Sequence, residues 1–106
     1  MPGGKVTRII KVKDFSTAPG GRYINHGPFS GEEFRNTVLI PAFKSGEQLL
    51  IDLDGTFGYA SCFIDEVFGE MARLHGKEIL KNLFFKSNEE PNLIEEILSV
   101  ISLEKK

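Results

Sequence analysis

A nearly continuous apolar run at residues 48–53 (Gln-Leu-Leu-Ile-Asp-Leu) constrains the fold more than any other feature of the sequence. The run has the length of a β-strand, and a strand that is apolar on both faces is typical of the centre of a parallel sheet. Asp54-Gly55 follows it and predicts a turn. The neighbouring segments must therefore supply strands that pair with this run and helices that cover it.

The segments on either side alternate between strand and helix patterns. Residues 6–12 and 79–85 are rich in β-branched and apolar residues and are predicted to be strands. Helical spacing of apolar residues follows Ser30, Ser61 and the Ser87–Pro91 segment. This order predicts an α/β domain with a small, mixed or mostly parallel sheet flanked by about three helices. With 106 residues, the chain is predicted to be one domain, 1–106, with a loose end at 1–4.

Three sequence signals set the expected ends of the helices. Ser30 is placed to cap the first helix, and Glu33, three residues later, completes a capping box. Pro41 cannot donate a backbone hydrogen bond, so this helix is expected to kink or end nearby, before Ser45-Gly46 closes it. Ser61 is predicted to cap the second helix, which His75-Gly76 ends.

The charges are unevenly distributed along the chain. The net charge is −2, with a balance of +4 in residues 1–44 and of −6 in residues 45–106. The net charge argues against a direct nucleic-acid binder. The asymmetry has two interpretations, which the sequence leaves open: one face attracts a charged partner, or the charges form an ordinary solvated surface.

The cysteine content and the absence of a targeting signal indicate a cytoplasmic protein. Cys62 is the single cysteine, and it suits a reducing compartment. His26 and His75 are the only histidines, so no zinc-binding cluster is present and no cofactor is expected. The sequence contains neither a signal-peptide core nor an apolar run of about 20 residues, the length that spans a membrane.

Two carboxylates follow the central run in the segment Asp52-Leu53-Asp54-Gly55-Thr56. This segment resembles the first motif of the haloacid-dehalogenase-like phosphatases, in which two such aspartates act on phosphorus and hold magnesium. The alternative function is therefore a small Mg-dependent phosphohydrolase that uses Asp52 and Asp54. Only 50 residues follow Thr56, and Asp65 is the one aspartate among them, which argues against the complete phosphatase site. In the structural interpretation, the two aspartates end a strand, and one of them caps or hydrogen-bonds the following turn.

A second resemblance covers much more of the chain. The strand, the acidic turn and the serine that precedes a helix resemble the centre of STAS domains, the fold of anti-sigma-factor antagonists. The whole chain looks like the STAS-like family of unknown function found in bacteria, phages and archaea. The matching pieces are Asp14-Phe15, Pro19–Tyr23, Gly27-Pro28, Ser30–Arg35, Ile51–Gly55, Gly58-Tyr59, Ser61, Phe63 and Phe68-Gly69.

The resemblance implies a non-enzymatic regulatory module that binds a protein. In the antagonists, a kinase that is also the anti-sigma factor phosphorylates a serine at this position, which corresponds to Ser61, or to Ala60 if the alignment moves by one residue. The implied partner is a histidine-kinase-like ATPase or another signalling protein. The alternative is purely structural: Ser61 is an ordinary N-cap residue of the helix. Residues 55–75 are the expected docking surface, with contacts from Gly55, Tyr59, Ser61, Cys62, Asp65 and Glu66.

The long loop before the first helix has its own candidate site. Gly20 and Gly21 allow backbone amides to approach an anion that Arg22 would clamp, which would suit a small-ligand sensor. Alternatively, Arg22 is structural and pairs with an acid such as Asp14, Asp52 or Asp54.

Two further side chains have expected roles. Arg35 is expected to pair along its own helix with Glu32 or Glu33. Cys62 is interpreted as a buried, inert thiol, with a reactive thiol at the start of the helix as the alternative.

Overall fold

The computed structural model describes residues 6–103 and contains a three-stranded parallel sheet. The strands are β1 (Arg8–Lys11), β2 (Leu49–Asp52) and β3 (Leu83–Lys86), in the spatial order β1-β2-β3. Ile51 lies opposite Ile10 on one side and Phe85 on the other. The apolar run at 48–53 is therefore the central strand, and the predicted parallel α/β architecture is confirmed. The predicted loose end at 1–4 lies outside the described residues.

Two long helices and a third, shorter helix alternate with the strands. The first long helix, residues 31–44, consists of α2 (Gly31–Phe34), η2 (Arg35–Leu39) and α3 (Ile40–Lys44). The second, residues 61–75, consists of α4 (Ser61–Ile64), η3 (Asp65–Gly69) and α5 (Glu70–His75). In both, the middle segment is π-helical. The third helix is α6 (Asn92–Ser102), and the short turns are α1 (Val12–Phe15), η1 (Ile24–His26) and η4 (Lys77–Lys81).

Both outer strands differ from their predicted ranges. Val12 belongs to the turn α1, so β1 is shorter than residues 6–12. Residues 79–81 lie in the 3₁₀ helix η4, and β3 begins only at Leu83. In η4, the N–H of Asn82 binds the carbonyl of Ile79 at 2.9 Å. Ile79 is buried, and a short apolar run does not by itself distinguish a strand from a helical turn.

The first long helix begins where predicted, and it continues past Pro41. Ser30 Oγ accepts a hydrogen bond from the N–H of Glu33 at 3.0 Å, which confirms the cap. The carboxylate of Glu33 accepts from the N–H of Phe29, not of Ser30, so the reciprocal bond of the box reaches one residue further back. The helix continues through Pro41, and in the π-helical segment before it the N–H of Ile40 binds the carbonyl of Arg35.

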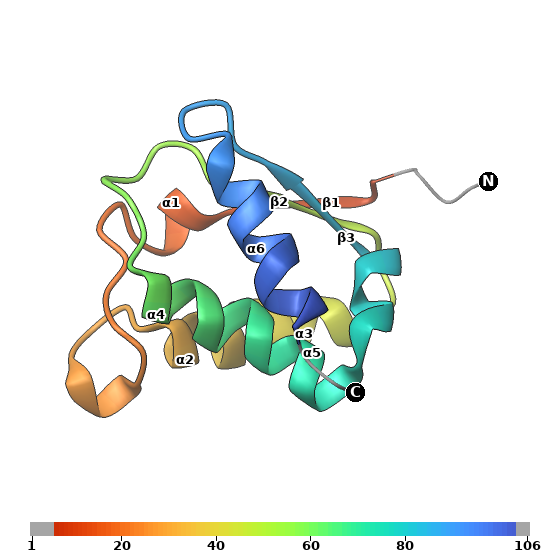
Figure 1. Ribbon diagram of the computed structural model, residues 1–106, viewed down its shortest axis with the longest axis horizontal. Coiled ribbons are helices and arrows are strands. Elements are labelled where there is room, and N and C mark those ends of the chain that lie inside the picture. The colour runs from red at the N-terminus through yellow and green to blue at the C-terminus, as the bar shows by residue number, and fades with distance from the viewer. Residues whose placement is uncertain (1–5, 104–106) are drawn as a thin grey trace.

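The helices pack on one side of the sheet. Figure 1 shows α6 crossing in front, with the helix 61–75 below it and the helix 31–44 behind. The side chains of Leu49, Ile51 and Leu83 point into this core, whereas Ile9 on the alternate face of β1 is 56% exposed. Within the core, the rings of Phe68 and Phe85 meet edge to face at 5.5 Å between centroids.

Two glycines allow the helices to approach closely. A Cβ atom on Gly31 would lie 2.9 Å from the carbonyl oxygen of Phe63, where the two long helices meet. A Cβ atom on Gly69 would lie 2.9 Å from Cγ1 of Val100, where α6 packs on the helix 61–75. Close packing at these points fixes how the helix 61–75 is placed, and its first turn carries the predicted contact residues.

Candidate functional site

The loop after β2, residues 53–60, is held in place along its length. The N–H of Gly55 donates to Oε1 of Glu89 at 2.8 Å, and the N–H of Phe57 donates to the carbonyl of Thr17 at 2.8 Å. Gly55 and Gly58 have φ values of +88° and +126°, which a glycine adopts without strain. The loop is thus ordered by contacts with two segments that are distant in sequence.

The carboxylates of Asp52 and Asp54 accept hydrogen bonds from backbone N–H groups. Oδ1 of Asp52 accepts from the N–H of Asp54 at 3.1 Å, and Nζ of Lys86 lies 3.9 Å from its Oδ2. The carboxylate of Asp54 accepts from the N–H groups of Glu89, at 2.9 Å, and of Asn88, at 3.1 Å. The bond from Glu89 is the main reason why the pKa of Asp54 lies below its usual value. Asp52 ends β2 and hydrogen-bonds the following turn, which confirms the structural interpretation, whereas Asp54 hydrogen-bonds the loop after β3.

The two aspartates do not gather a further metal ligand. Within residues 6–103, no group of three or more histidine, cysteine or acidic side chains is arranged so that it could hold a metal ion. The carboxylate of Glu89, in the loop after β3, accepts from the N–H of Gly55, and that loop meets Asp54 through backbone amides.

A pocket of about 260 Å³ lies between the loops that follow β2 and β3. Leu53 and Leu93, which are 3% and 2% exposed, contribute apolar surface to it. Asp54, Glu89 and Glu90 also line it. Tyr59 forms part of the wall and donates its hydroxyl to the carbonyl of Leu53 at 2.8 Å, and burial raises the pKa of Tyr59 to about 12. This is the edge of the sheet at which α/β proteins commonly bind ligands.

Phe57, which the sequence analysis did not select, lines the same pocket and is 90% exposed. It is the most exposed of the large hydrophobic residues in the described chain. The sequence did contain a signal. Phe57 lies between Gly55 and Gly58, and it belongs neither to the apolar pattern of the preceding strand nor to that of the following helix. Interfaces draw much of their binding energy from a few large side chains, so this exposed phenylalanine is a candidate contact residue.

Ser61 is exposed and is the first residue of α4, but it does not cap the helix. The carbonyl of Ala60 accepts from the N–H groups of Phe63 and Ile64, at 3.0 and 3.2 Å, so Ala60 is the N-cap residue. The prediction that Ser61 caps this helix was therefore wrong by one position. Cys62, expected to be buried, is of intermediate exposure.

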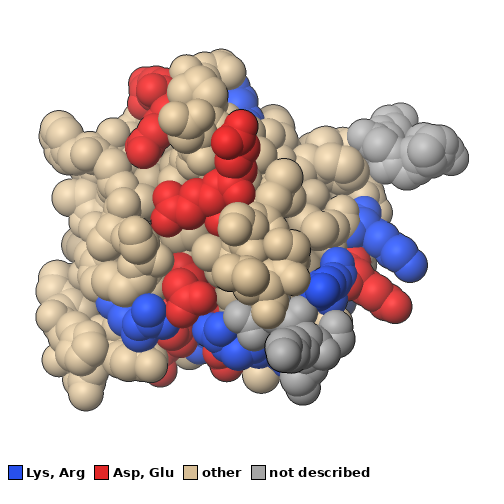
Figure 2. Space-filling model, viewed as in Figure 1, with Lys and Arg blue, Asp and Glu red and all other residues tan. Residues whose placement is uncertain are grey.

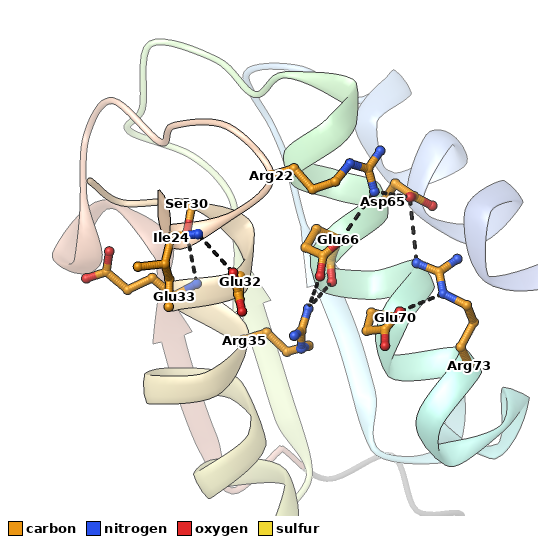
Figure 3. A network of polar contacts seen from close by, with 10 residues as sticks. All are labelled: Arg22, Ile24, Ser30, Glu32, Glu33, Arg35, Asp65, Glu66, Glu70 and Arg73. Atoms are coloured by element: carbon orange, nitrogen blue, oxygen red, sulfur yellow. Dashed lines mark hydrogen bonds and ion pairs between the residues drawn. The ribbon is translucent and has the colours of Figure 1, made fainter. Parts of the chain in front are cut away.

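Arg22 reaches from the long loop to the helix 61–75, as Figure 3 shows. Its Nη1 lies 2.6 Å from Oδ2 of Asp65 and 3.3 Å from Oε1 of Glu66. Arg73 contacts Asp65 at 3.6 Å and Glu70 at 2.7 Å. The prediction of a structural ion pair for Arg22 is confirmed, but its partners are not Asp14, Asp52 or Asp54, because the part of the loop that carries Arg22 lies against the helix 61–75.

Arg35 lies between the two long helices and is 7% exposed. Its Nη1 donates to a carboxylate oxygen and to the carbonyl of Glu66, both at 2.7 Å. The expected pairing with Glu32 or Glu33 was wrong, because those carboxylates accept from the N–H groups of Ile24 and Phe29.

The predicted contact residues differ in exposure. Gly55 and Ser61 are exposed, Tyr59, Cys62 and Asp65 are half-buried, and Glu66 is buried.

The Gly20–Arg22 segment supports the start of the helix 31–44. The carbonyls of Gly21 and Arg22 accept from the N–H groups of Gly31 and Glu32, at 2.8 and 3.0 Å. The N–H of Gly20 binds the carbonyl of Phe29 at 2.8 Å. The first amides of this helix are therefore used by the protein itself, and anion binding at this loop stays a prediction.

Comparison with known protein families identifies the family of this chain. The family described as a STAS-like domain of unknown function (DUF4325) matches residues 30–93, which is more than half of the chain. The chain belongs to this family. The STAS-like match includes β2, the helix 61–75 and β3, whereas the pieces at 14–28 that carried part of the sequence resemblance lie before it. No curated protein and no solved structure shows significant similarity.

The STAS-like match includes both loops that form the pocket, as well as Phe57 and Ser61. Figure 2 shows acidic side chains over the part of the surface where α6 begins, and most of the visible basic side chains lower on the same face. Among the described residues of this STAS-like domain, no helix has the length and apolar character needed to cross a bilayer.

Proposed function

We propose that this STAS-like domain is a non-enzymatic regulatory module that binds a protein partner in the cytoplasm. Its contact surface would be the loop 54–60 together with Ser61 and Cys62 at the start of α4. The observation that carries the proposal is Phe57, an aromatic side chain that an ordered loop keeps 90% exposed. By its family resemblance, the partner is a histidine-kinase-like ATPase or another signalling protein.

The order of the loop favours binding. Binding usually costs free energy because side chains and loops at the interface lose conformational freedom. Here the N–H groups of Gly55 and Phe57 already have partners within the protein, so the loop has little freedom left to lose. Aromatic residues near the centre of an interface often contribute most of its binding energy.

Ser61 would act as the switch on this surface. A phosphate adds a charge of about −1.5 to −2, and the first turn of a helix favours an anion. Asp65 lies one turn further along the same helix face and would repel this charge. Arg22, which already contacts Asp65 at 2.6 Å, is a cation able to respond. Phosphorylation would therefore alter both the charge of the contact surface and the position of the Arg22 loop.

A site-specific crosslinking experiment tests the contact surface. A photo-crosslinking residue at position 57 would be compared with one at position 99, because Ser99 is exposed on α6. We expect a partner to crosslink at position 57 and not at 99. A partner that crosslinks only at 99 would contradict the proposed surface.

The switch has its own test, with the partner identified by crosslinking. Ser61→Asp should weaken partner binding at least tenfold, whereas Ser99→Asp, an equal change of charge elsewhere, should leave it within about twofold. Mass spectrometry after incubation with the cognate kinase should find phosphate on Ser61. Equal binding by the two variants, together with an unmodified Ser61, would reject the switch.

A further inference from the structure

The pocket between the loops after β2 and β3 combines apolar surface with one sign of charge. Among its lining residues in the described part of the chain, three are acidic and none is basic. Leu53 and Leu93 supply buried apolar surface, and Phe57 projects into solvent. Such a pocket is complementary to a group that has an apolar stem and a positively charged end.

Two of the acidic side chains are fixed by reciprocal bonds between the loops. Asp54 accepts from the N–H groups of Asn88 and Glu89, and the carboxylate of Glu89 accepts from the N–H of Gly55 at 2.8 Å. These donors are neutral backbone groups, so the bonds orient the carboxylates without cancelling their charge. Lys13 and Lys86 act on Asp54 from outside the lining.

We propose that this pocket receives an arginine side chain of the partner, next to an apolar partner residue that packs on Phe57. The proposal rests on the proposed function and specifies the chemistry of the partner. The carboxylates would bind the guanidinium, which forms paired hydrogen bonds with carboxylates, and its methylene stem would contact Leu53 and Leu93.

The size of the pocket favours a single side chain. Pockets for drug-sized molecules usually measure about 300–1,000 Å³, and this one measures about 260 Å³. A divalent cation is a poorer fit, because within residues 6–103 no three histidine, cysteine or acidic side chains, the three acids of the pocket included, are arranged so that they could hold a metal ion. An organic cation needs no such cage, since hydrogen bonds and apolar contacts hold it.

A peptide titration followed by ¹H–¹⁵N NMR tests this inference. The probe is acetyl-Leu-Arg-Leu-amide, and its matched control carries citrulline, a neutral isostere of arginine. We expect saturable shifts at residues 54–59 and 87–93 with a Kd on the order of 1 mM, and at least tenfold weaker binding of the citrulline peptide. Equal binding of both peptides, shifts confined to other residues, or no saturation at about 10 mM peptide would overturn the proposal.

Two charge variants sharpen the titration. Glu90 lines the pocket and is exposed, so Glu90→Gln should fold normally and weaken the arginine peptide about fivefold or more. Glu95→Gln removes an exposed acid of α6 outside the pocket and should change the affinity less than twofold. Equal losses in the two variants would show that net charge, and not the pocket, attracts the peptide.

The titration needs neither the partner nor a phosphate on Ser61, so the two proposals fail separately. If the peptide does not bind but the partner still crosslinks at position 57, only the arginine pocket is rejected. If the peptide binds and the partner crosslinks elsewhere, the proposed contact surface is rejected.

Discussion

The two acid-rich regions of this protein use their carboxylates in opposite ways. On the helix 61–75, Asp65, Glu66 and Glu70 each contact at least one arginine. At the pocket, the carboxylates of Asp54 and Glu89 accept from backbone N–H groups. The helix region therefore pairs its acids with arginines of the protein, whereas the carboxylates of Asp54 and Glu89 at the pocket are bound by neutral backbone groups.

The difference arises from the elements that carry the acids. Helical side chains three and four residues apart share a face and meet the side chains of a neighbouring helix or loop. Loops after parallel strands instead leave backbone amides without a sheet partner, and nearby carboxylates satisfy them. A count of acidic residues thus says little about function until their partners are known.

Among the charged residues, the largest expected effect falls on the helix region. Arg35→Met should lower the free energy of unfolding by about 3 kcal/mol, because it leaves Glu66 buried without its main partner. Urea denaturation measures this loss. The double variant Arg35→Met with Glu66→Leu should recover much of the loss, because it removes the uncompensated charge. If the double variant is as unstable as the single one, the Arg35–Glu66 pair stabilises the fold through the packing of its side chains and not through its charges.

A smaller loss is expected where the two long helices touch. Gly31→Ala should cost about 1–3 kcal/mol, since the added methyl group would lie 2.9 Å from the carbonyl oxygen of Phe63. Gly21→Ala is the control, because a Cβ atom there would meet nothing within 4 Å. Thermal unfolding of both variants compares them directly. Equal stability would mean that the helices separate at little cost.

At the pocket, the charge of Asp54 should make the stability of the protein depend on pH in the acid range. Since the folded pKa of Asp54 lies below its usual value of 3.8, its carboxylate contributes stability that is fully present above that value. The contribution is lost as the pH falls through the lower folded pKa. Between neutral pH and about pH 2, the urea midpoint of the wild type should therefore fall further than that of Asp54→Asn. Parallel midpoints would show that the bonds to Asn88 and Glu89 do not depend on the charge.

The smallest effect on stability is expected at Phe57. Phe57→Ala should change the free energy of unfolding by no more than about 0.5 kcal/mol, because the ring is 90% exposed. Phe63→Ala, a loss of the same ring at 1% exposure, should cost about 3–5 kcal/mol. Chemical denaturation separates the two outcomes. A large loss at Phe57 would make its ring structural and remove it from the contact surface.

The sequence by itself determined the layout of the domain. The apolar run at 48–53 identified the central strand, and helical spacing identified the helices that begin after Ser30, near Ser61 and after Pro91. The cap at Ser30 and the turn at Asp52–Gly55 were also predictable. These features depend on residues within a few positions of one another, so periodicity and local hydrogen bonding are enough to predict them.

Only the tertiary structure decided which charges pair and which side chains face solvent. Arg22 and Asp65 are 43 positions apart, and Arg35 and Glu66 are 31 apart, so nothing in the local sequence selects these partners. The pocket likewise requires the loops after β2 and β3 to lie side by side. Phe57 and Phe63 are the same residue type six positions apart, and packing alone leaves one in solvent and places the other in the core. Such choices depend on distances between segments that meet only when the chain folds.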